Sequence, residues 1–244
     1  MRILITAGGT SESIDPVRKI TNTSSGRLGA VIADYMVQNG HDIVYVHGRK
    51  ATLPMRTYEK HPIIGVRDLQ AVMKDILTTQ KIDAVIHAMA VSDYFVDYVT
   101  TPELAAKDYE NAANINELRQ KILTGKNRLN NREKLSSDEE SLMVVLKKSP
   151  KVIQEIKQHA PNVILIGFKL FADATYEKLE AAAFKQIETC GSDLVVANNL
   201  QYNKNLHATW LIGPHGLIGY AGTKRDIAKR LSDYVETHRP ATRN

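Results

Sequence analysis

The chain has 244 residues, of which 43% are hydrophobic and 24% are charged, and its formal net charge is +5. This length and composition are typical of a single compact domain and exclude intrinsic disorder, a collagen-like repeat and a coiled coil. No run of about 18 apolar residues occurs, so we expect no membrane-spanning helix. The N-terminus runs directly into a strand-like segment without a secretory cleavage site, which predicts a cytoplasmic protein.

The numbers and spacing of cysteine and histidine limit the disulfides and metal sites that the chain could form. The only cysteine, Cys190, excludes an intrachain disulfide and a cysteine-rich zinc site, and its place in a helical pattern predicts a small buried residue. The eight histidines show neither HExxH nor HxH spacing, so a histidine metal site is not expected. The positive net charge suits phosphorylated small molecules, nucleotides or nucleic acid as partners.

The first third of the chain alternates between strand and helix patterns. A continuous apolar run predicts a buried strand over residues 2–7, as in a parallel sheet that is covered on both faces. Apolar residues at helical spacing predict helices over 25–38 and 69–77. Further apolar runs predict strands over 42–46 and 84–88.

This alternation is interrupted over residues 94–141, which are polar and rich in Asn, Lys and Arg. Only weak helical periodicity appears there, over 115–123. Long irregular segments inside a compact domain are uncommon and are often functional. We therefore interpret 94–141 as an insertion: a flap, a partner-contacting arm or a lid.

The alternation then resumes to the end of the chain. Ser149 followed by Pro150 predicts a helix start, with Ser149 as N-cap. The other predicted elements are strands over 142–146, 163–167 and 193–197, a helix over 175–190, a hairpin of 208–212 with 217–220, and a helix over 223–236. The pattern predicts an α/β fold: a doubly wound, mostly parallel Rossmann-like sheet with helices on both faces. We expect a single domain over 1–244 with the insertion at about 94–141.

Ligands of such sheets bind beyond the carboxyl ends of the strands. The loop after the first strand lacks the dinucleotide fingerprint, because Gly8 and Gly9 are adjacent and lie far before the helix. A Walker A sequence is also absent. The segment 22–26 at the helix start is either an anion site or ordinary capping by Ser24 or Ser25.

Asn22 opens this segment and allows two interpretations. A carboxamide offers donors and an acceptor without charge, so it suits the orientation of a carboxylate or a mixed anhydride. Alternatively, Asn22 is a turn residue in the left-handed conformation.

Several motifs then point to a family. The segment GGTSESIDPVRKITNTSSGRLG and the strand end AMAVSDY, followed by LKKSPKVI, IGFK and DLVVANN, resemble the phosphopantothenate–cysteine ligases of coenzyme A synthesis. The motifs occur in the family order from residue 3 to about residue 200. The resemblance implies that a nucleoside triphosphate, CTP with ATP as its main rival, activates the carboxylate of 4′-phosphopantothenate as an acyl nucleotide and releases pyrophosphate. Cysteine then displaces the nucleotide to give 4′-phosphopantothenoylcysteine.

The resemblance also assigns roles to residues by position. Asn22 matches the asparagine that holds the acyl nucleotide, and Met89 matches a backbone amide that faces the reacting carboxylate. The implied substrate contacts are Ser24, Ser25, Gly26, Met89 and Ala90. The implied nucleotide contacts are Asp93, Ser149, Pro150, Lys151, Val152, Phe168 and Lys185. Phe168 is alternatively an ordinary core residue at a strand end.

The catalytic lysine of the family matches Lys134 best, eight residues before Leu142. About 40 residues separate Lys134 from Asp93, whereas the fused bacterial enzymes have a short link, and the competing cations in this segment are Lys126, Arg128 and Arg132. The implied role of Lys134 is to neutralise the activated phosphate. A further basic position of the family falls near Thr189, where this chain has no lysine.

The resemblance implies Mg²⁺ with the triphosphate, no protein residue as metal ligand, and a homodimer. The ligase motifs begin at residue 8, which predicts ligase activity alone, without the flavin-dependent decarboxylase of the fused bacterial enzymes. A competing hypothesis is an NADP-dependent reductase, with Arg49 at a 2′-phosphate. Another is a nucleic-acid-binding protein using the basic stretch 119–134, but that stretch lacks interleaved aromatic rings for base stacking, so we expect no nucleic acid partner.

Overall fold

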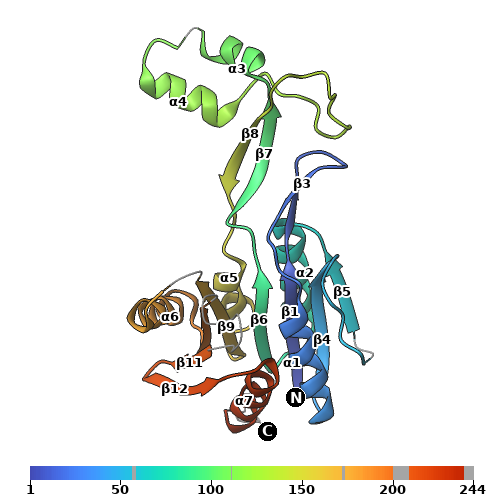
Figure 1. Ribbon diagram of the computed structural model, residues 1–244, viewed down its shortest axis with the longest axis vertical. Helices are drawn as coiled ribbons and strands as arrows, with labels where there is room; N and C mark the ends of the chain where they lie inside the picture. Colours follow the sequence, from blue (N-terminus) through green and yellow to red (C-terminus); the bar gives the residue numbers. More distant parts are fainter. Residues whose placement is uncertain (57–58, 111, 172–173, 200–208, 239–244) are drawn as a thin grey trace. The chain divides into compact units, whose positions relative to one another are not determined.

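The computed structural model describes residues 1–56, 59–110, 112–171, 174–199 and 209–238 (Figure 1). The chain forms two compact units. The first, called here the sheet unit, comprises Met1–Thr10, Asn22–Val91 and Lys151–Asn244. The second, the inserted unit, comprises two stretches of chain, Ser11–Thr21 and Ser92–Pro150. The polar segment 94–141 lies within the second stretch.

The sheet unit is built on eight hydrogen-bonded strands in the order β12-β11-β10-β9-β6-β1-β4-β5. All pairings from β5 to β10 are parallel, and β11 and β12 are antiparallel. The strands are β1 (Arg2–Gly9), β4 (Asp42–Gly48), β5 (Glu59–Ile63), β6 (Ala84–Ala90), β9 (Ile164–Phe171), β10 (Leu194–Asn199), β11 (Thr209–Gly213) and β12 (Gly216–Ala221). The predicted doubly wound, mostly parallel sheet is confirmed.

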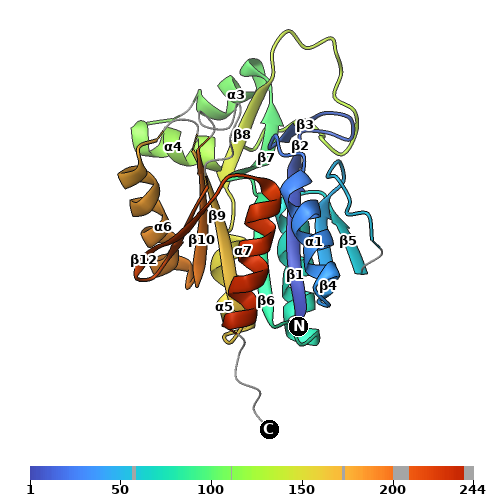
Figure 2. The ribbon, with the colours of Figure 1, turned by 60° about the horizontal axis from the view of Figure 1, so that its bottom comes forward.

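Helices cover both faces of this sheet, because the central strands are apolar on both sides (Figure 2). One core cluster joins α1 and α7 to one face, where Leu194 and Val196 of β10 point. Another joins α6 to the opposite face, where Val195 and Ala197 point. The helices are α1 (Arg27–Gln38), α2 (Val66–Thr79), α5 (Val152–His159), α6 (Tyr176–Cys190) and α7 (Lys224–Thr237).

The described residues of the inserted unit form two antiparallel strand pairs and two helices. The first pair is β2 (Ser11–Ser13) with β3 (Lys19–Thr21). The second is β7 (Tyr94–Thr100) with β8 (Met143–Lys148). The helices α3 (Pro102–Tyr109) and α4 (Ile115–Thr124) lie between β7 and β8 in the chain.

Two predictions at the edges of this insertion are wrong. The strand predicted over 142–146 is present as β8 at 143–148, but β8 pairs with β7 in the inserted unit and does not resume the central sheet. Ser149 does not cap a helix, because α5 starts at Val152 with Lys151 as N-cap. The N–H of Ser149 instead donates to the carbonyl of Asp93 at 2.8 Å, which extends the β7–β8 ladder by one pair. Pro150 therefore precedes the helix.

The other expected elements are present, with ends shifted by a few residues. Helix α1 begins at Arg27, two residues later than predicted. The hairpin was expected to begin at residue 208, which lies outside the described residues, and β11 is described from Thr209. Cys190 is buried and free, as expected. The edge strand β5 has no counterpart in the sequence analysis, because its segment, EKHPI, has no apolar run.

Candidate active site

The order of the sheet reverses between β1 and β6. From β1 the chain adds β4 and β5 on one side, and then β6, β9 and β10 on the other. At the carboxyl ends of the two strands, Gly8 pairs with Met89 and Gly9 pairs with Ala90. The N–H of Thr10 donates to the carbonyl of Ala90 at 3.1 Å. Because doubly wound sheets bind ligands at such a reversal, this rim is the candidate active site.

The 22–26 turn returns the chain to this rim. The N–H of Asn22 donates to the carbonyl of Thr10 at 3.2 Å, and the N–H of Ser24 donates to the carbonyl of Asn22 at 3.0 Å. A Cβ atom on Gly9 would lie 2.4 Å from the carbonyl oxygen of Asn22. Since Gly9 also pairs with Ala90, the structure brings the 22–26 turn and the end of β6 to one rim.

Asn22 is half-buried in this turn. Among the residues that the structure describes, every positive φ angle belongs to a glycine. The alternative interpretation of Asn22 as a left-handed turn residue is therefore wrong. A Cβ atom on Gly9 would lie 3.4 Å from the Cβ of Asn22, so the Asn22 side chain starts at the end of β1, and its carboxamide can both donate and accept hydrogen bonds.

Helix α1 begins against the end of β1 without a capping side chain. Its N-cap is Gly26, at φ 71° and ψ 1°, and the hydroxyl of Ser25 only accepts the Arg27 N–H at 3.4 Å. The alternative of ordinary capping by Ser24 or Ser25 is therefore wrong. A Cβ atom on Gly26 would lie 3.1 Å from the backbone nitrogen of Gly8. The positive end of the helix dipole thus stands at the rim, and the N-cap residue Gly26 offers no side chain to the first-turn N–H groups.

Three of the predicted nucleotide residues lie near the neighbouring strand end. Lys151 is exposed and Val152 is buried at the start of α5. Phe168 follows Gly167 in β9, and Gly167 pairs with His87 of β6. Phe168 is half-buried and packs on the core cluster, so it contributes to the core as well as to the strand end.

The fourth nucleotide residue of the sheet unit, Lys185, lies on the exposed face of α6. The next residue, Gln186, faces the sheet: a Cβ atom on Gly167 would lie 1.8 Å from Gln186 Nε2. Gln186 is 7% exposed, and Nε2 has no hydrogen-bond partner among the described residues. No sequence motif points to Gln186, although helical spacing places it in the buried stripe Leu179, Ala183, Gln186 and Cys190.

The remaining predicted residues belong to the inserted unit. Asp93 is exposed and Ser149 is buried, and the backbone hydrogen bond between them holds the two together at the end of the β7–β8 pair. Pro150 follows in the chain and is half-buried. Lys134 is exposed and lies in the irregular segment 125–142 between α4 and β8.

A buried histidine lies behind the rim, between the two central strands. The Nδ1 atom of His87 is 3.0 Å from the hydroxyl oxygen of Thr6, and both side chains are buried. Burial disfavours the imidazolium and lowers the pKa of His87 from 6.5 to about 4. His87 is therefore neutral at physiological pH and joins β6 to β1 through a hydrogen bond.

This shift predicts a loss of stability in mild acid. The folded protein takes up the His87 proton less readily than the unfolded chain, so stability falls as the pH drops from about 6.5 to about 4 and levels off below. The contribution of His87 is on the order of 3 kcal/mol. Urea unfolding at pH 7.5 and 4.5 measures it, and we expect His87→Gln to flatten this pH dependence. The exposed His215 provides the control, since His215→Gln should retain the wild-type slope. Equal slopes for the two variants would contradict the assignment.

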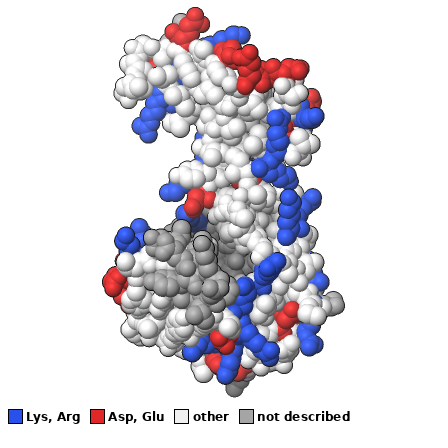
Figure 3. Space-filling view, in the orientation of Figure 1, with Lys and Arg blue, Asp and Glu red and all other residues white. Residues whose placement is uncertain are grey.

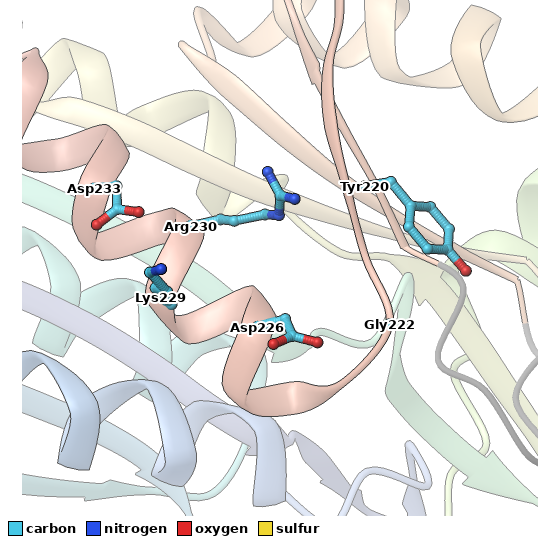
Figure 4. Close-up of a pocket in the computed structure, with 6 residues that line it drawn as sticks. All are labelled: Tyr220, Gly222, Asp226, Lys229, Arg230 and Asp233. Atoms are coloured by element: carbon cyan, nitrogen blue, oxygen red, sulfur yellow. The ribbon is translucent and has the colours of Figure 1, made fainter.

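A separate cavity of about 420 Å³ lies between β12 and α7 (Figure 4). None of the predicted site residues lines it. Its walls are formed by Tyr220, Gly222, Asp226, Lys229, Arg230 and Asp233. Along α7 two acidic residues, Asp226 and Asp233, flank the basic pair Lys229 and Arg230, and such a mixture of charges is typical of a solvated helix surface. This cavity therefore does not compete with the rim as the candidate active site.

Within the described part of the chain, no helix is long and apolar enough to cross a membrane. The same residues contain no group of three or more His, Cys, Asp or Glu side chains that could hold a metal ion.

Comparison with known proteins agrees with the fold and with the motifs. The family described as DNA/pantothenate metabolism flavoprotein C-terminal domain matches residues 1–122 and 126–238. The coenzyme A biosynthesis bifunctional protein CoaBC of Thermococcus kodakarensis is 33% identical over 237 residues, covering 96% of this chain and 51% of the relative. The corresponding protein of Methanocaldococcus jannaschii is 25% identical over 240 residues, covering 96% of this chain and 50% of the relative. The chain thus spans about half the length of these curated relatives.

Solved structures with a similar fold carry names from the same family. The DNA/pantothenate metabolism flavoprotein from Streptococcus pneumoniae superimposes with a TM-score of 0.82 at 32% identity, covering 98% of this chain and 99% of the other. The C-terminal domain of a CoaBC protein has the same fold, with a TM-score of 0.69 at 22% identity over 97% of this chain and 94% of the other. The chain therefore belongs to the family of DNA/pantothenate metabolism flavoprotein C-terminal domains.

Proposed function

We propose that this protein is a phosphopantothenate–cysteine ligase. A nucleoside triphosphate activates the carboxylate of 4′-phosphopantothenate as an acyl nucleotide and releases pyrophosphate, and the cysteine amine then displaces the nucleotide. The observation that carries the proposal is the packing of the 22–26 turn and the uncapped start of α1 against Gly9 at the sheet reversal. The names of the relatives place them in coenzyme A biosynthesis, which supports this reaction.

The chemistry explains why such a rim suits the reaction. A carboxylate is a poor electrophile at neutral pH, and the phosphoryl ester supplies the leaving group that it lacks. The protein must hold two anions together, so it offsets their repulsion with dipoles and cations. At the rim, α1 supplies the dipole, and the exposed Arg49 and Lys50 follow β4 at the same edge of the sheet.

Within this proposal each predicted residue has a role. Asn22 orients the acyl nucleotide, and the backbone amide of Met89 faces the reacting carboxylate. Ser24, Ser25, Gly26 and Ala90 complete the substrate site. Asp93, Phe168, Lys185 and the segment 149–152 bind the nucleotide, and Lys134 neutralises the activated phosphate.

We further propose CTP as the triphosphate, no flavin, a homodimer and a cytoplasmic location. Magnesium is proposed to enter with the triphosphate. Mg²⁺ usually keeps several waters and binds through phosphates with only one or two carboxylates. Such a site needs no cluster of protein ligands. One structural neighbour, a Cab2 mutant of 16% identity, is a complex with phosphopantothenate-cysteine, which supports the choice of product.

The test is a coupled assay with 4′-phosphopantothenate, cysteine, Mg²⁺ and each triphosphate in turn. We expect pyrophosphate and the amide in equal amounts with CTP. Without cysteine, pyrophosphate release should stop after about one equivalent per site. Pyrophosphate without any amide, or no product with any triphosphate, would contradict the proposed function.

A further inference from the structure

The loop between β2 and β3 contains a buried carboxylate with an unusual number of donors. Asp15 is 1% exposed. Its Oδ1 atom accepts the N–H groups of Val17 at 2.9 Å and Arg18 at 2.7 Å. Its Oδ2 atom accepts Arg18 Nε at 2.8 Å and the N–H of Leu135 at 3.3 Å. The last of these bonds joins segments that are 120 residues apart in the chain.

Arg18 completes the attachment to Leu135. Its Nη2 atom lies 2.6 Å from Asp15 Oδ2 and donates to the carbonyl of Leu135 at 2.9 Å. The N–H and the carbonyl of Leu135 are therefore both held by the Asp15–Arg18 pair. All three residues belong to the inserted unit.

The charge state of the pair is stable near neutral pH. Burial alone would raise the pKa of Asp15, but the hydrogen bonds from Arg18 and from the three backbone N–H groups hold this pKa far below its usual range. The carboxylate is therefore ionised and paired with the Arg18 guanidinium. Its contribution to stability is present above about pH 4 and is lost only when the pH falls through the lowered pKa.

Leu135 is the anchor of the second half of the irregular segment. Leu135 is 6% exposed, whereas Lys134 and Ser136 on either side are exposed. Among the described hydrogen bonds, those of Leu135 are the ones that join residues 130–142 to another segment. The earlier part is attached separately, where the N–H of Leu129 donates to the carbonyl of Val99 at 2.8 Å.

The remaining charges of this segment would not hold Lys134 in place. Acidic side chains gather over the loop that precedes β8 (Figure 3). The exposed acids of the segment are Glu133, Asp138, Glu139 and Glu140. Without an anchor, the ammonium of Lys134 is free to pair with several of these carboxylates instead of a triphosphate.

The geometry points to the Asp15–Arg18 pair as a positioning device for Lys134. The pair clamps the backbone of Leu135 and so fixes where the neighbouring lysine is presented. Neither Asp15 nor Arg18 needs to touch the substrate for this role. The inference rests on the proposed function for the task of Lys134, but the clamp itself is a property of the inserted unit.

Limited trypsin digestion tests the clamp without any assay of activity. Trypsin cleaves the Lys134–Leu135 bond, and the clamp holds the N–H of that bond and the next carbonyl. We expect Arg18→Met to speed this cleavage at least about tenfold, because a protease needs a locally opened chain. Lys121→Gln removes a surface ion pair with Glu117 in the same unit and should leave the rate unchanged. An unchanged rate in Arg18→Met would overturn the clamp.

A double-variant cycle then tests whether the clamp acts through Lys134. We expect Arg18→Met to slow pyrophosphate release about 100-fold, since a displaced catalytic group costs about that much. Residues that act as one unit are non-additive, so adding Arg18→Met to Lys134→Gln should cause no further loss. Arg18→Lys keeps the charge pair with Asp15 but cannot form both contacts, and should recover part of the rate.

Several outcomes separate this inference from the proposed function. Independent losses in the double variant, or a raised KM for phosphopantothenate in Arg18→Met, would overturn the positioning role, because Arg18 would then contact the substrate. Wild-type pyrophosphate release by Lys134→Gln would overturn it as well. If the wild-type protein forms no product with any triphosphate, the proposed function fails, and the trypsin rates still decide the clamp.

Discussion

Replacing Asn22 with alanine is expected to slow the attack of cysteine on the acyl nucleotide by about 10²- to 10³-fold. Asn22 carries a neutral hydrogen-bonding group at the end of β1, and the loss of one such group at a reacting carbonyl costs about that much. Pyrophosphate release without cysteine should fall far less, because the proposed mechanism assigns formation of the acyl nucleotide to Lys134 and not to Asn22. The variant should therefore accumulate the acyl nucleotide.

Acid-quenched time courses that follow pyrophosphate and acyl nucleotide separately measure this effect. Asn39→Ala is the matched control, since Asn39 lies at the other end of α1 and its Nδ2 atom donates to the carbonyl of Tyr35 at 2.8 Å. The control should show wild-type time courses. If Asn22→Ala behaves like Asn39→Ala, the proposed role is refuted. Equal losses in both half-reactions would contradict a role that is confined to the attack of cysteine.

Gly26→Ala is expected to destabilise the protein by about 2–5 kcal/mol. An alanine there has to adopt the left-handed conformation of Gly26, which costs about 1–2 kcal/mol. Its Cβ atom would also lie 2.9 Å from the Cβ of Ala51 and 3.1 Å from the backbone nitrogen of Gly8. The backbone of β1 cannot move aside cheaply, so overpacking adds about 1–3 kcal/mol.

Gly40→Ala provides the matched control for this comparison. Gly40 has φ 79°, close to the 71° of Gly26, but a Cβ atom there would meet nothing within 4 Å. Urea unfolding should therefore show only the conformational cost for Gly40→Ala, about 1 kcal/mol. The Gly26 variant should also lose ligase turnover, since the 22–26 turn would separate from the rim. Equal destabilisation of the two variants would show that the turn is not packed as described.

The central sheet could be predicted from the sequence because its signals are local. Residues 3–5 form a continuous apolar run that is fully buried in β1, and the stripe over 69–77 places Leu69, Met73 and Ile76 on the buried side of α2. The reversal between β1 and β6 then follows from the doubly wound topology. That topology was sufficient to predict a ligand site in the loop after β1.

The inserted unit could not be predicted in the same way because its pairings are long-range. The partly exposed β8 carries no buried run, and nothing local indicates that it pairs with β7. The clamp on Leu135 depends on Asp15 and Arg18, which are more than 115 residues away in the chain. In contrast, Gln186 was missed for a different reason: motif matching favoured the charged Lys185, although the helical stripe already placed Gln186 on the buried face.

The way in which the chain crosses between the units has a consequence for engineering and for evolution. The first excursion leaves after Thr10 and returns at Asn22, and these two residues are hydrogen-bonded to each other. The second runs from Ser92 to Pro150, and its ends are joined in the same way through Asp93 and Ser149. Each excursion thus begins and ends at residues that are hydrogen-bonded to each other. The length of the chain between them can therefore change at a low entropic cost. We therefore expect length changes between β7 and β8 that keep Leu135 in contact with Asp15 and Arg18 to leave the strand order of the sheet unchanged.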